Sequence, residues 1–262
     1  MLANFHTHTV WCDGKNTPRE MAEAAVAKGF GLLGFSSHMA LPEGGEGTVA
    51  PGRAQAYVAE IRALAREYAG RLEILCGAEA EYIPGATAPE QSRYAHLGLD
   101  YLIGSVHYVV ADDGARVPVD YTPELLFAGI KAHFAGNARA FVERYFAQQI
   151  DMVEKFDFDI LGHPDLVRKF NLRHPYFDES APWVRECEAR LAEALAKSGK
   201  LAEVNTGAIA RGWLDDAYPA APFRELLKNR GVGFVLSSDA HSAAGLDCAF
   251  DRDFGVAFKT EI

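Results

Sequence analysis

The chain has 262 residues, a length that suits one α/β barrel as well as two small domains and allows a large buried core. Apolar residues make up 49% and charged residues 24%, a composition that excludes a disordered or fibrous chain. Acidic residues outnumber basic ones by 36 to 26, and the net charge of −10 argues against nucleic acid or an anionic membrane as a partner.

The cysteines do not form a disulfide framework or a zinc-knuckle pattern, because they are widely spaced and no C-x-x-C pair occurs. We expect free thiols in a reducing compartment. The N-terminal segment lacks the basic and apolar regions of a secretion signal, and no apolar run reaches transmembrane length. The sequence therefore predicts a cytoplasmic protein with no membrane partner.

Short β-branched or aromatic segments alternate with segments of helical period along the whole chain, the pattern of repeated β and α units. The predicted strands cover residues 4–8, 32–38, 72–79, 101–107, 158–163, 201–206 and 233–241. A fold of class α/β with a parallel arrangement of strands follows from this alternation.

The helix between the first two strands has the clearest boundaries. Thr17, Pro18 and Glu20 supply an N-cap, a first-turn proline and a capping-box acid, and Gly29 ends the segment. Further helices are predicted within 53–70, 121–156, 180–199 and 222–231, the second of these ranges holding two helices divided at Gly136-Asn137. Because no repeat or linker divides the chain, we expect a single domain over residues 1–262.

Polar or ionisable residues stand at the end of every predicted strand. They are His6, His8, His38, Glu79, His107, His163, Asn205, Asp239 and His241, with Asp13 just beyond the first strand. The carboxyl ends of parallel strands form one face, so these side chains are expected to converge there. A lone histidine at a strand end is usually an ordinary hydrogen-bonded residue, but its repetition indicates a metal site.

The chemistry of the predicted site follows from its ligands. Imidazole and carboxylate together suit Zn, Mn or Fe, and their number exceeds the needs of one ion, which predicts two to three divalent ions. Such a centre activates water and neutralises a phosphoryl oxygen or polarises a carbonyl, so hydrolysis is the expected reaction.

Seven motifs resemble, in order and spacing, the polymerase and histidinol phosphatase (PHP) family. The resemblance extends from about residue 4 to about residue 245, and rests on FHTHTVWCDG, GFSSHMALP, GAEAEYIPG, IGSVHYV, ILGHPDLVRKF, EVNTGAIARG and LSSDAHSA. The Gly136-Asn137 pair ahead of VERYF, together with GHPDLVRKF, is similar to the histidinol-phosphatase branch in particular.

This resemblance implies a distorted (β/α)7 TIM-like barrel that hydrolyses L-histidinol phosphate to L-histidinol and inorganic phosphate, a step of histidine biosynthesis, by means of a metal-bridged hydroxide. It also implies a trinuclear centre. One ion would be held by His6, His8, Glu79 and Asp239, a second by Glu79, His107 and His163, and a third by Asp13, His38 and His241.

Phosphate recognition requires cations beside the metal ions. Arg168, Lys169 and Arg211 follow strand-end motifs by a few residues, so we expect them on loops of the same face, although each could instead brace a loop. Arg168 or Arg211 would stabilise the developing charge, and Asp239 or His241 would assist protonation of the leaving oxygen.

Two motifs depart from the family pattern, since Ser37 stands where an acid is more usual and NTGAIARG lacks a serine. The substrate could therefore be another phosphomonoester, a nucleotide-derived phosphodiester or a carbonyl compound. A polymerase-associated proofreading module is a further alternative, which the acidic composition disfavours.

Overall fold

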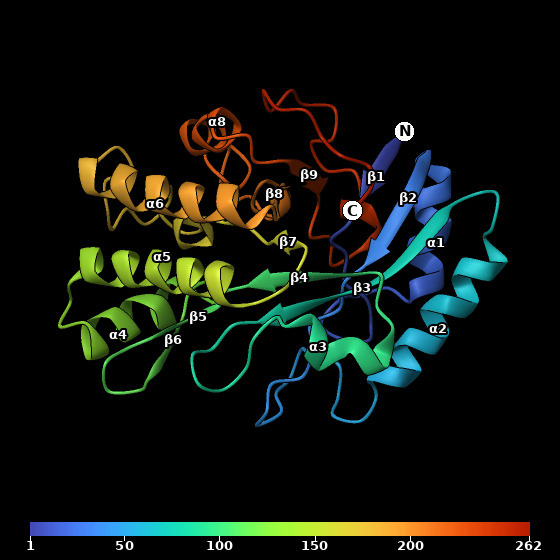
Figure 1. The fold of residues 1–262 in the computed structure, drawn as a ribbon, viewed down its shortest axis with the longest axis horizontal. Coiled ribbons are helices and arrows are strands. Elements are labelled where there is room, and N and C mark those ends of the chain that lie inside the picture. Colours follow the sequence, from blue (N-terminus) through green and yellow to red (C-terminus); the bar gives the residue numbers. More distant parts are fainter.

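The structure, a computed structural model, describes residues 1–262 and contains a parallel sheet that curves into a nearly closed barrel (Figure 1). Its strands lie in the order β1-β2-β3-β4-β7-β8-β9. Their bounds are Leu2–Asn4 (β1), Phe30–Phe35 (β2), Glu73–Glu81 (β3), Tyr101–Ser105 (β4), Ile160–Leu161 (β7), Leu201–Asn205 (β8) and Phe234–Ser237 (β9). The predicted (β/α)7 TIM-like barrel is confirmed, with a strand at each predicted position.

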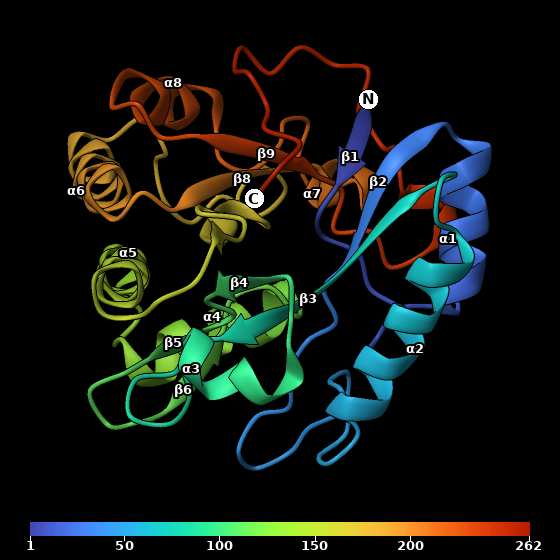
Figure 2. The same ribbon diagram turned by 45° about the vertical axis from the view of Figure 1, so that its right-hand side comes forward.

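Helices cover the outside of the barrel, as the alternating sequence pattern predicts (Figure 2). The α-helices are α1 (Pro18–Ala27), α2 (Ala54–Glu67), α3 (Gln91–Tyr94), α4 (Pro123–His133), α5 (Ala138–Lys155), α6 (Pro182–Ser198), α7 (Gly207–Ala210) and α8 (Ala221–Asn229). Short 3₁₀ helices occur at η1 (Ala95–Leu97), η2 (Leu166–Arg168) and η3 (Ala243–Gly245). None of the helices combines the length and the apolar character needed to cross a membrane.

The predicted helix boundaries depend on identifiable caps. The Thr17 side chain accepts a hydrogen bond from the backbone N–H of Glu20, and the Glu20 carboxylate accepts from the backbone N–H of Thr17, which completes the capping box of α1. Asn137 caps α5 in the same manner by accepting from the N–H of Ala140. The division predicted at Gly136-Asn137 is thus confirmed, since α4 ends before it and α5 begins after it.

The barrel closes between its first and last strands through contacts beyond the regular strand pairing. Thr7 and Ala240 form an isolated parallel bridge, and the backbone N–H of His8 donates to the carbonyl oxygen of Ala240 at 2.9 Å. The Asn4 amide donates to Ser238 Oγ at 2.6 Å. Residues from the two ends of the chain therefore share one seam of the barrel.

The first strand covers Leu2–Asn4 and not the predicted 4–8, because side chains accept several of the backbone hydrogen bonds beyond Asn4. The N–H of His6 donates to Asn4 Oδ1, and the N–H of Thr7 donates to Ser36 Oγ. His6 and His8 consequently lie on an irregular segment, yet their rings remain neighbours with centroids 5.0 Å apart.

A small apolar cluster fills the barrel interior beneath the site. Tyr101 is its largest member, and its hydroxyl donates to the carbonyl oxygen of Phe5. Gly34 and Gly77 leave room for the ring, because a Cβ at either position would come within 2.3 Å of Tyr101 atoms. This packing seals the lower barrel, so the functional groups stand only at its carboxyl end.

One hairpin was absent from the predicted elements. Strands β5 (Tyr108–Val110) and β6 (Arg116–Pro118) pair antiparallel directly after β4. Each strand has three residues, too few to produce a clear alternating pattern. The hairpin matters because it supplies part of the wall of the main cavity.

Candidate metal centre

The predicted ligands converge at the carboxyl end of the barrel around the buried Glu79 on β3. Its carboxylate oxygens lie within 3.6 Å of a ring nitrogen from five histidines. They are His38 (2.9 Å), His163 (3.0 Å), His6 (3.1 Å), His107 (3.5 Å) and His8 (3.6 Å). The expectation that the strand ends meet is confirmed for these side chains.

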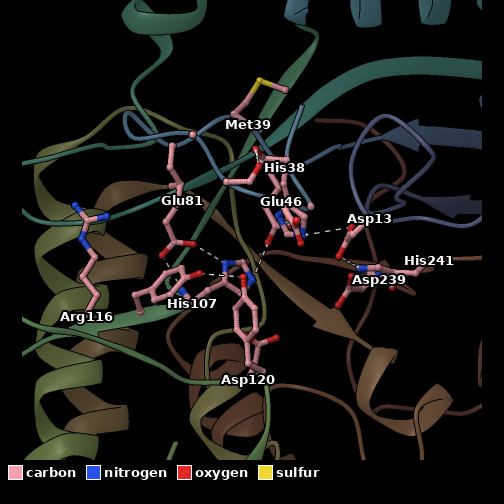
Figure 3. Close-up of a pocket in the computed structure, with 18 of the residues that line it drawn as sticks. Asp13, His38, Met39, Glu46, Glu81, His107, Arg116, Asp120, Asp239 and His241 are labelled. Carbon is pink, nitrogen blue, oxygen red and sulfur yellow. Dashed lines mark hydrogen bonds and ion pairs between the residues drawn. The ribbon is translucent and has the colours of Figure 1, made fainter. Parts of the chain in front are cut away.

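The remaining predicted ligands complete the cluster on the side of the barrel seam. Asp239 Oδ1 lies 3.2 Å from His8 Nε2 and 3.5 Å from His241 Nδ1. Asp13 Oδ2 lies 3.0 Å from His241 Nε2, and its Oδ1 lies 3.9 Å from His38 Nε2. In Figure 3, Asp13, Asp239 and His241 occupy one side of the cavity and His107 the other.

Three subsets have the compactness that one metal ion requires. They are His8, Asp13, His38 and His241; His6, His8 and Glu79; and His38, Glu79 and His107. Glu79 is common to two groups, as in the three sets that the family resemblance implies, but His8 and His38 also fall in two groups, and His163 and Asp239 fall in none. Shared ligands of this kind suit adjacent ions in one centre.

Several imidazoles have one nitrogen directed to an outer partner and the other directed to the cluster. His6 Nδ1 lies 2.7 Å from Glu203 Oε1, and His107 Nδ1 lies 2.6 Å from Glu81 Oε2. A proton on Nδ1 satisfies each of these carboxylates and leaves Nε2 as a bare ligand atom. His241 differs, since its Nδ1 lies 2.9 Å from the carbonyl oxygen of Asp239 and 3.0 Å from Arg211 Nη2, while its Nε2 lies 3.0 Å from Asp13 Oδ2.

A second, independent observation shows that these residues fit a metal ion. Several of their polar atoms are buried and lack a hydrogen-bond partner. His6 Nε2, His8 Nε2 and Glu79 Oε2 are all buried without such a partner, although they lie close together. With His6 Nδ1 protonated toward Glu203, two lone pairs face each other at 3.1 Å, a conflict that either a second proton on the ring or a metal ion between the two atoms removes.

The charges of the cluster also favour cations. Burial alone would lower the pKa of His107, but the carboxylates of Glu81 and Glu79 raise it to about 9. Burial is likewise outweighed at His6, where Glu203 and Glu79 raise the pKa well above its ordinary value. Fields that attract a proton to these rings attract a divalent ion as well.

Asp13 belongs to the cluster and stays ionised there. Burial would raise its pKa, but the hydrogen bond from His241 and the charges of His8 and His38 hold the pKa below its usual range. The backbone is turned into the left-handed region at two other cluster residues, His163 (φ 26°) and Asp239 (φ 50°). Such conformations are costly outside glycine and concentrate at functional sites.

Sequence reasoning missed Glu203, a fully buried acid on β8. Its Oε1 lies beside His6 Nδ1, while its Oε2 accepts from the backbone N–H of His163 (2.8 Å) and from the Asn205 amide (2.9 Å). The signal was the spacing of Leu201, Glu203 and Asn205, which places all three on the inward face of a strand. Asn205 in turn accepts from the N–H of Gly207, a strand-end cap.

A cavity of about 770 Å³ opens above the cluster. Two of the predicted phosphate-binding cations line it, Arg211 and Lys169. Arg211 Nη1 lies 3.3 Å from Asp239 Oδ2, and Lys169 Nζ donates to the carbonyl oxygen (2.7 Å) and the carboxylate (3.1 Å) of Asp120. Both cations therefore border the space in which a phosphoryl group next to the cluster would lie.

Arg168 is not among the residues that line this cavity, and its predicted contact with the phosphate stays a prediction. Its Nε donates to Glu179 Oε2 at 2.7 Å, its Nη1 faces Asp165 Oδ2 at 3.5 Å, and the side chain lines a separate small cavity. The 3₁₀ turn η2 aims the side chain there, where two buried or half-buried carboxylates neutralise it. These contacts are the ones that the loop-bracing alternative requires.

Substitutions of the two arginines are expected to separate these roles. Arg168→Ala leaves Asp165 without its cation and should lower the free energy of unfolding by about 3 kcal/mol, with KM unchanged. Arg211→Ala should preserve stability and lower kcat/KM about a hundredfold. Urea unfolding measures the stability of each variant, and steady-state phosphate release measures its kinetic constants. An Arg168→Ala protein of normal stability with a raised KM would show that Arg168 binds the substrate.

The small cavity beside Arg168 contains a second buried acid, Glu188 on α6. Burial raises its pKa to about 7, despite a 2.7 Å hydrogen bond from Arg185. In the unfolded chain the same carboxyl titrates near pH 4.3, so between these values the folded state binds more protons and stability falls as pH rises.

Glu188→Gln should remove this contribution to the pH dependence. We expect the variant and the parent protein to be similarly stable at pH 4.5, and the variant to be more stable at pH 8 by up to about 3 kcal/mol. Urea unfolding of both proteins at the two pH values measures the difference. A parent protein that gains stability over the variant on going to pH 8 would contradict the expected sign.

A TIM-like barrel that gathers histidines and carboxylates at its carboxyl end is the architecture of a metal-dependent hydrolase. A family model described as the PHP domain matches residues 4–207. This chain belongs to the PHP family.

Named relatives extend over nearly the whole chain. A protein of Deinococcus radiodurans called a probable histidinol-phosphatase is 32% identical, over 92% of this chain and 86% of its own. The histidinol-phosphatase of Bacillus subtilis is 27% identical, over 94% and 96% of the two chains.

Two solved structures share the fold. The putative histidinol phosphatase of Listeria monocytogenes superposes with a TM-score of 0.82 at 20% identity, covering 95% of this chain and 99% of its own. The histidinol phosphate phosphatase of Lactococcus lactis, complexed with zinc, L-histidinol and phosphate, superposes with a TM-score of 0.65 at 23% identity, covering 92% and 86%.

Proposed function

We propose that this protein is a metal-dependent histidinol-phosphatase, which hydrolyses L-histidinol phosphate to L-histidinol and inorganic phosphate. The observation that carries the proposal is the cluster around Glu79, next to Arg211 and Lys169 in one cavity. The relatives named histidinol-phosphatase, which align over nearly the full chain, support this substrate among phosphomonoesters.

The proposed centre holds two to three divalent ions of Zn, Mn or Fe, bound by the nine clustered side chains. They are His6, His8, Asp13, His38, Glu79, His107, His163, Asp239 and His241. When bound, such ions make water acidic enough to attack at neutral pH and offset the charge of the phosphoryl oxygens.

The other groups of the cavity bind and orient the substrate. Arg211 and Lys169 donate to the phosphoryl oxygens and fix the phosphorus for in-line attack by water. Both already face carboxylates, Asp239 and Asp120, so the substrate phosphate competes with these partners for the same donors.

Asp239 has the proton-transfer role in this proposal. Burial would raise its pKa, but Arg211 and His6 hold the pKa well below its usual range, so the resting carboxylate is ionised. An ionised Asp239 accepts the proton of the attacking water and passes it to the histidinol oxygen as the P–O bond breaks. The backbone carbonyl of Asp239 and the Arg211 guanidinium both lie within 3.0 Å of His241 Nδ1 and orient that ring.

The experiment that tests the function is phosphate release from L-histidinol phosphate by the metal-loaded enzyme, with a single turnover in heavy-oxygen water. Direct attack by water predicts one label in the phosphate and none in L-histidinol. His8→Ala should lose bound metal and activity together. Full activity in a metal-deficient His8→Ala protein, or label in the alcohol, would refute the proposal.

We further propose that residues 1–262 act as one catalytic unit, because the cluster draws ligands from both ends of the chain. The cytoplasmic location derived from the sequence stays a prediction.

A further inference from the structure

The cavity is far larger than a phosphate group requires, and its outer part has a composition unlike that of the metal cluster. A volume of about 770 Å³ accommodates a whole organic substrate. The outer wall consists of the loop after β2, residues 41–48, and of the β5–β6 hairpin with the residues that follow it. These segments would face the alcohol portion of a phosphomonoester whose phosphate lies at the cluster.

Most charged groups of this wall are already paired. Glu43 on the loop forms an ion pair with Arg116 on β6, and Asp120 forms one with Lys169. Glu46 on the same loop makes no ion pair and no side-chain hydrogen bond, although it lines the cavity. The outer wall therefore retains one uncompensated negative charge.

The loop backbone holds Glu46 next to the cluster. Gly45 and Gly47 on either side adopt positive φ values of 156° and 78°, which a residue with a Cβ rarely adopts. A Cβ at Gly47 would lie 3.5 Å from Asp13 Cβ, so the loop passes directly over a cluster residue. Figure 3 shows Glu46 on the same side of the cavity as His38, across from Asp120.

Two tyrosines form an aromatic surface on the hairpin side of the same cavity. The rings of Tyr108 and Tyr121 have centroids 6.0 Å apart, and their hydroxyl oxygens are 3.0 Å apart. Tyr121 is 59% exposed, an unusual exposure for a large ring that lines a cavity. Exposed aromatic faces bind planar rings by stacking and cations by their quadrupole.

We propose that Glu46 and the Tyr108–Tyr121 pair select phosphomonoesters whose alcohol portion is cationic and carries a planar ring. Glu46 accepts a hydrogen bond from the ammonium group, and the tyrosine pair packs against the ring. This inference rests on the proposed phosphatase function and adds the residues that determine its specificity. The metal cluster would cleave many phosphomonoesters, whereas the outer wall favours those that carry positive charge.

The test compares Glu46→Gln with the parent enzyme on three substrates: L-histidinol phosphate, phosphoethanolamine and glycerol phosphate. The first two carry an ammonium group and the third does not. We expect Glu46→Gln to raise KM roughly fivefold for the two cationic substrates, with kcat and the KM for glycerol phosphate unchanged. Glu23→Gln, which removes an exposed charge on α1 outside the cavity, is the matched control and should behave as the parent enzyme.

A second pair of variants tests the aromatic surface. Tyr121→Ala should raise KM for L-histidinol phosphate but not for phosphoethanolamine, which has no ring, and Tyr121→Phe should restore the parent value. Equal effects of Glu46→Gln on all three substrates, or no effect on any, would overturn the specificity proposal. A parent enzyme that cleaves phosphoethanolamine but not L-histidinol phosphate would instead refute the proposed function, and Glu46 could still be tested on phosphoethanolamine.

Discussion

Glu79→Gln is expected to abolish phosphatase activity, with a loss of kcat of at least about a thousandfold, because the metal centre contributes several kcal/mol to the transition state. Glu79 is the only carboxylate within 3.6 Å of five histidine rings. Glutamine keeps the shape but removes the negative charge that two of the three compact ligand groups share. Both groups should therefore lose affinity for their ions.

Elemental analysis of the purified variant, together with phosphate release, measures this result. Glu73→Gln is a suitable control because it lies on the same strand, is exposed and is remote from the carboxyl end of the barrel. The control should retain its metal and its activity. A Glu79→Gln protein that keeps a full complement of metal and normal kcat would exclude Glu79 as a shared ligand.

Removal of the metal ions should destabilise the protein as a whole. Ligands that bind only the folded state stabilise it by about 4 kcal/mol when their free concentration is a thousand times Kd. For a chain of this size, the corresponding decrease in Tm is roughly 10 °C. The buried atoms of His6, His8 and Glu79 that lack hydrogen bonds add to the effect, because the metal-free site leaves them unsatisfied.

Calorimetry before and after treatment with a chelator measures the change, and addition of Zn or Mn to the stripped protein should reverse it. His8→Ala supplies the control, since a protein that cannot bind the ions should show little response to the chelator. An unchanged Tm in the chelated parent protein would mean that the cluster is stable without ions and would weaken the assignment of a metal centre.

Local patterns were sufficient to predict the alternating α/β units and the gathering of ligands at the strand ends, whereas the (β/α)7 barrel was predicted from the resemblance to the PHP family. Strand segments, helix caps such as Thr17 and Asn137, and histidines at strand ends can each be recognised within a few residues. The topology of a parallel barrel then brings the strand ends together without any further information.

Long-range pairing could not be predicted in the same way. Arg168 donates a hydrogen bond to Glu179, eleven residues later, and nothing in the motif GHPDLVRKF indicates this partner. The Glu43–Arg116 ion pair likewise joins segments that are far apart in the sequence. Glu203 was detectable in principle from the inward spacing on its strand, but a single acid in an apolar segment is a weak signal.

The seam between β1 and β9 determines when the metal centre can form. His6 and His8 follow β1, whereas Asp239 and His241 follow β9. The contacts across the seam join residues more than 200 positions apart. The ligand set is complete only once β9 and the residues after it have packed against the segment that follows β1. Binding of ions by the full ligand set is therefore coupled to closure of this seam, a contact that forms slowly because it joins distant parts of the sequence.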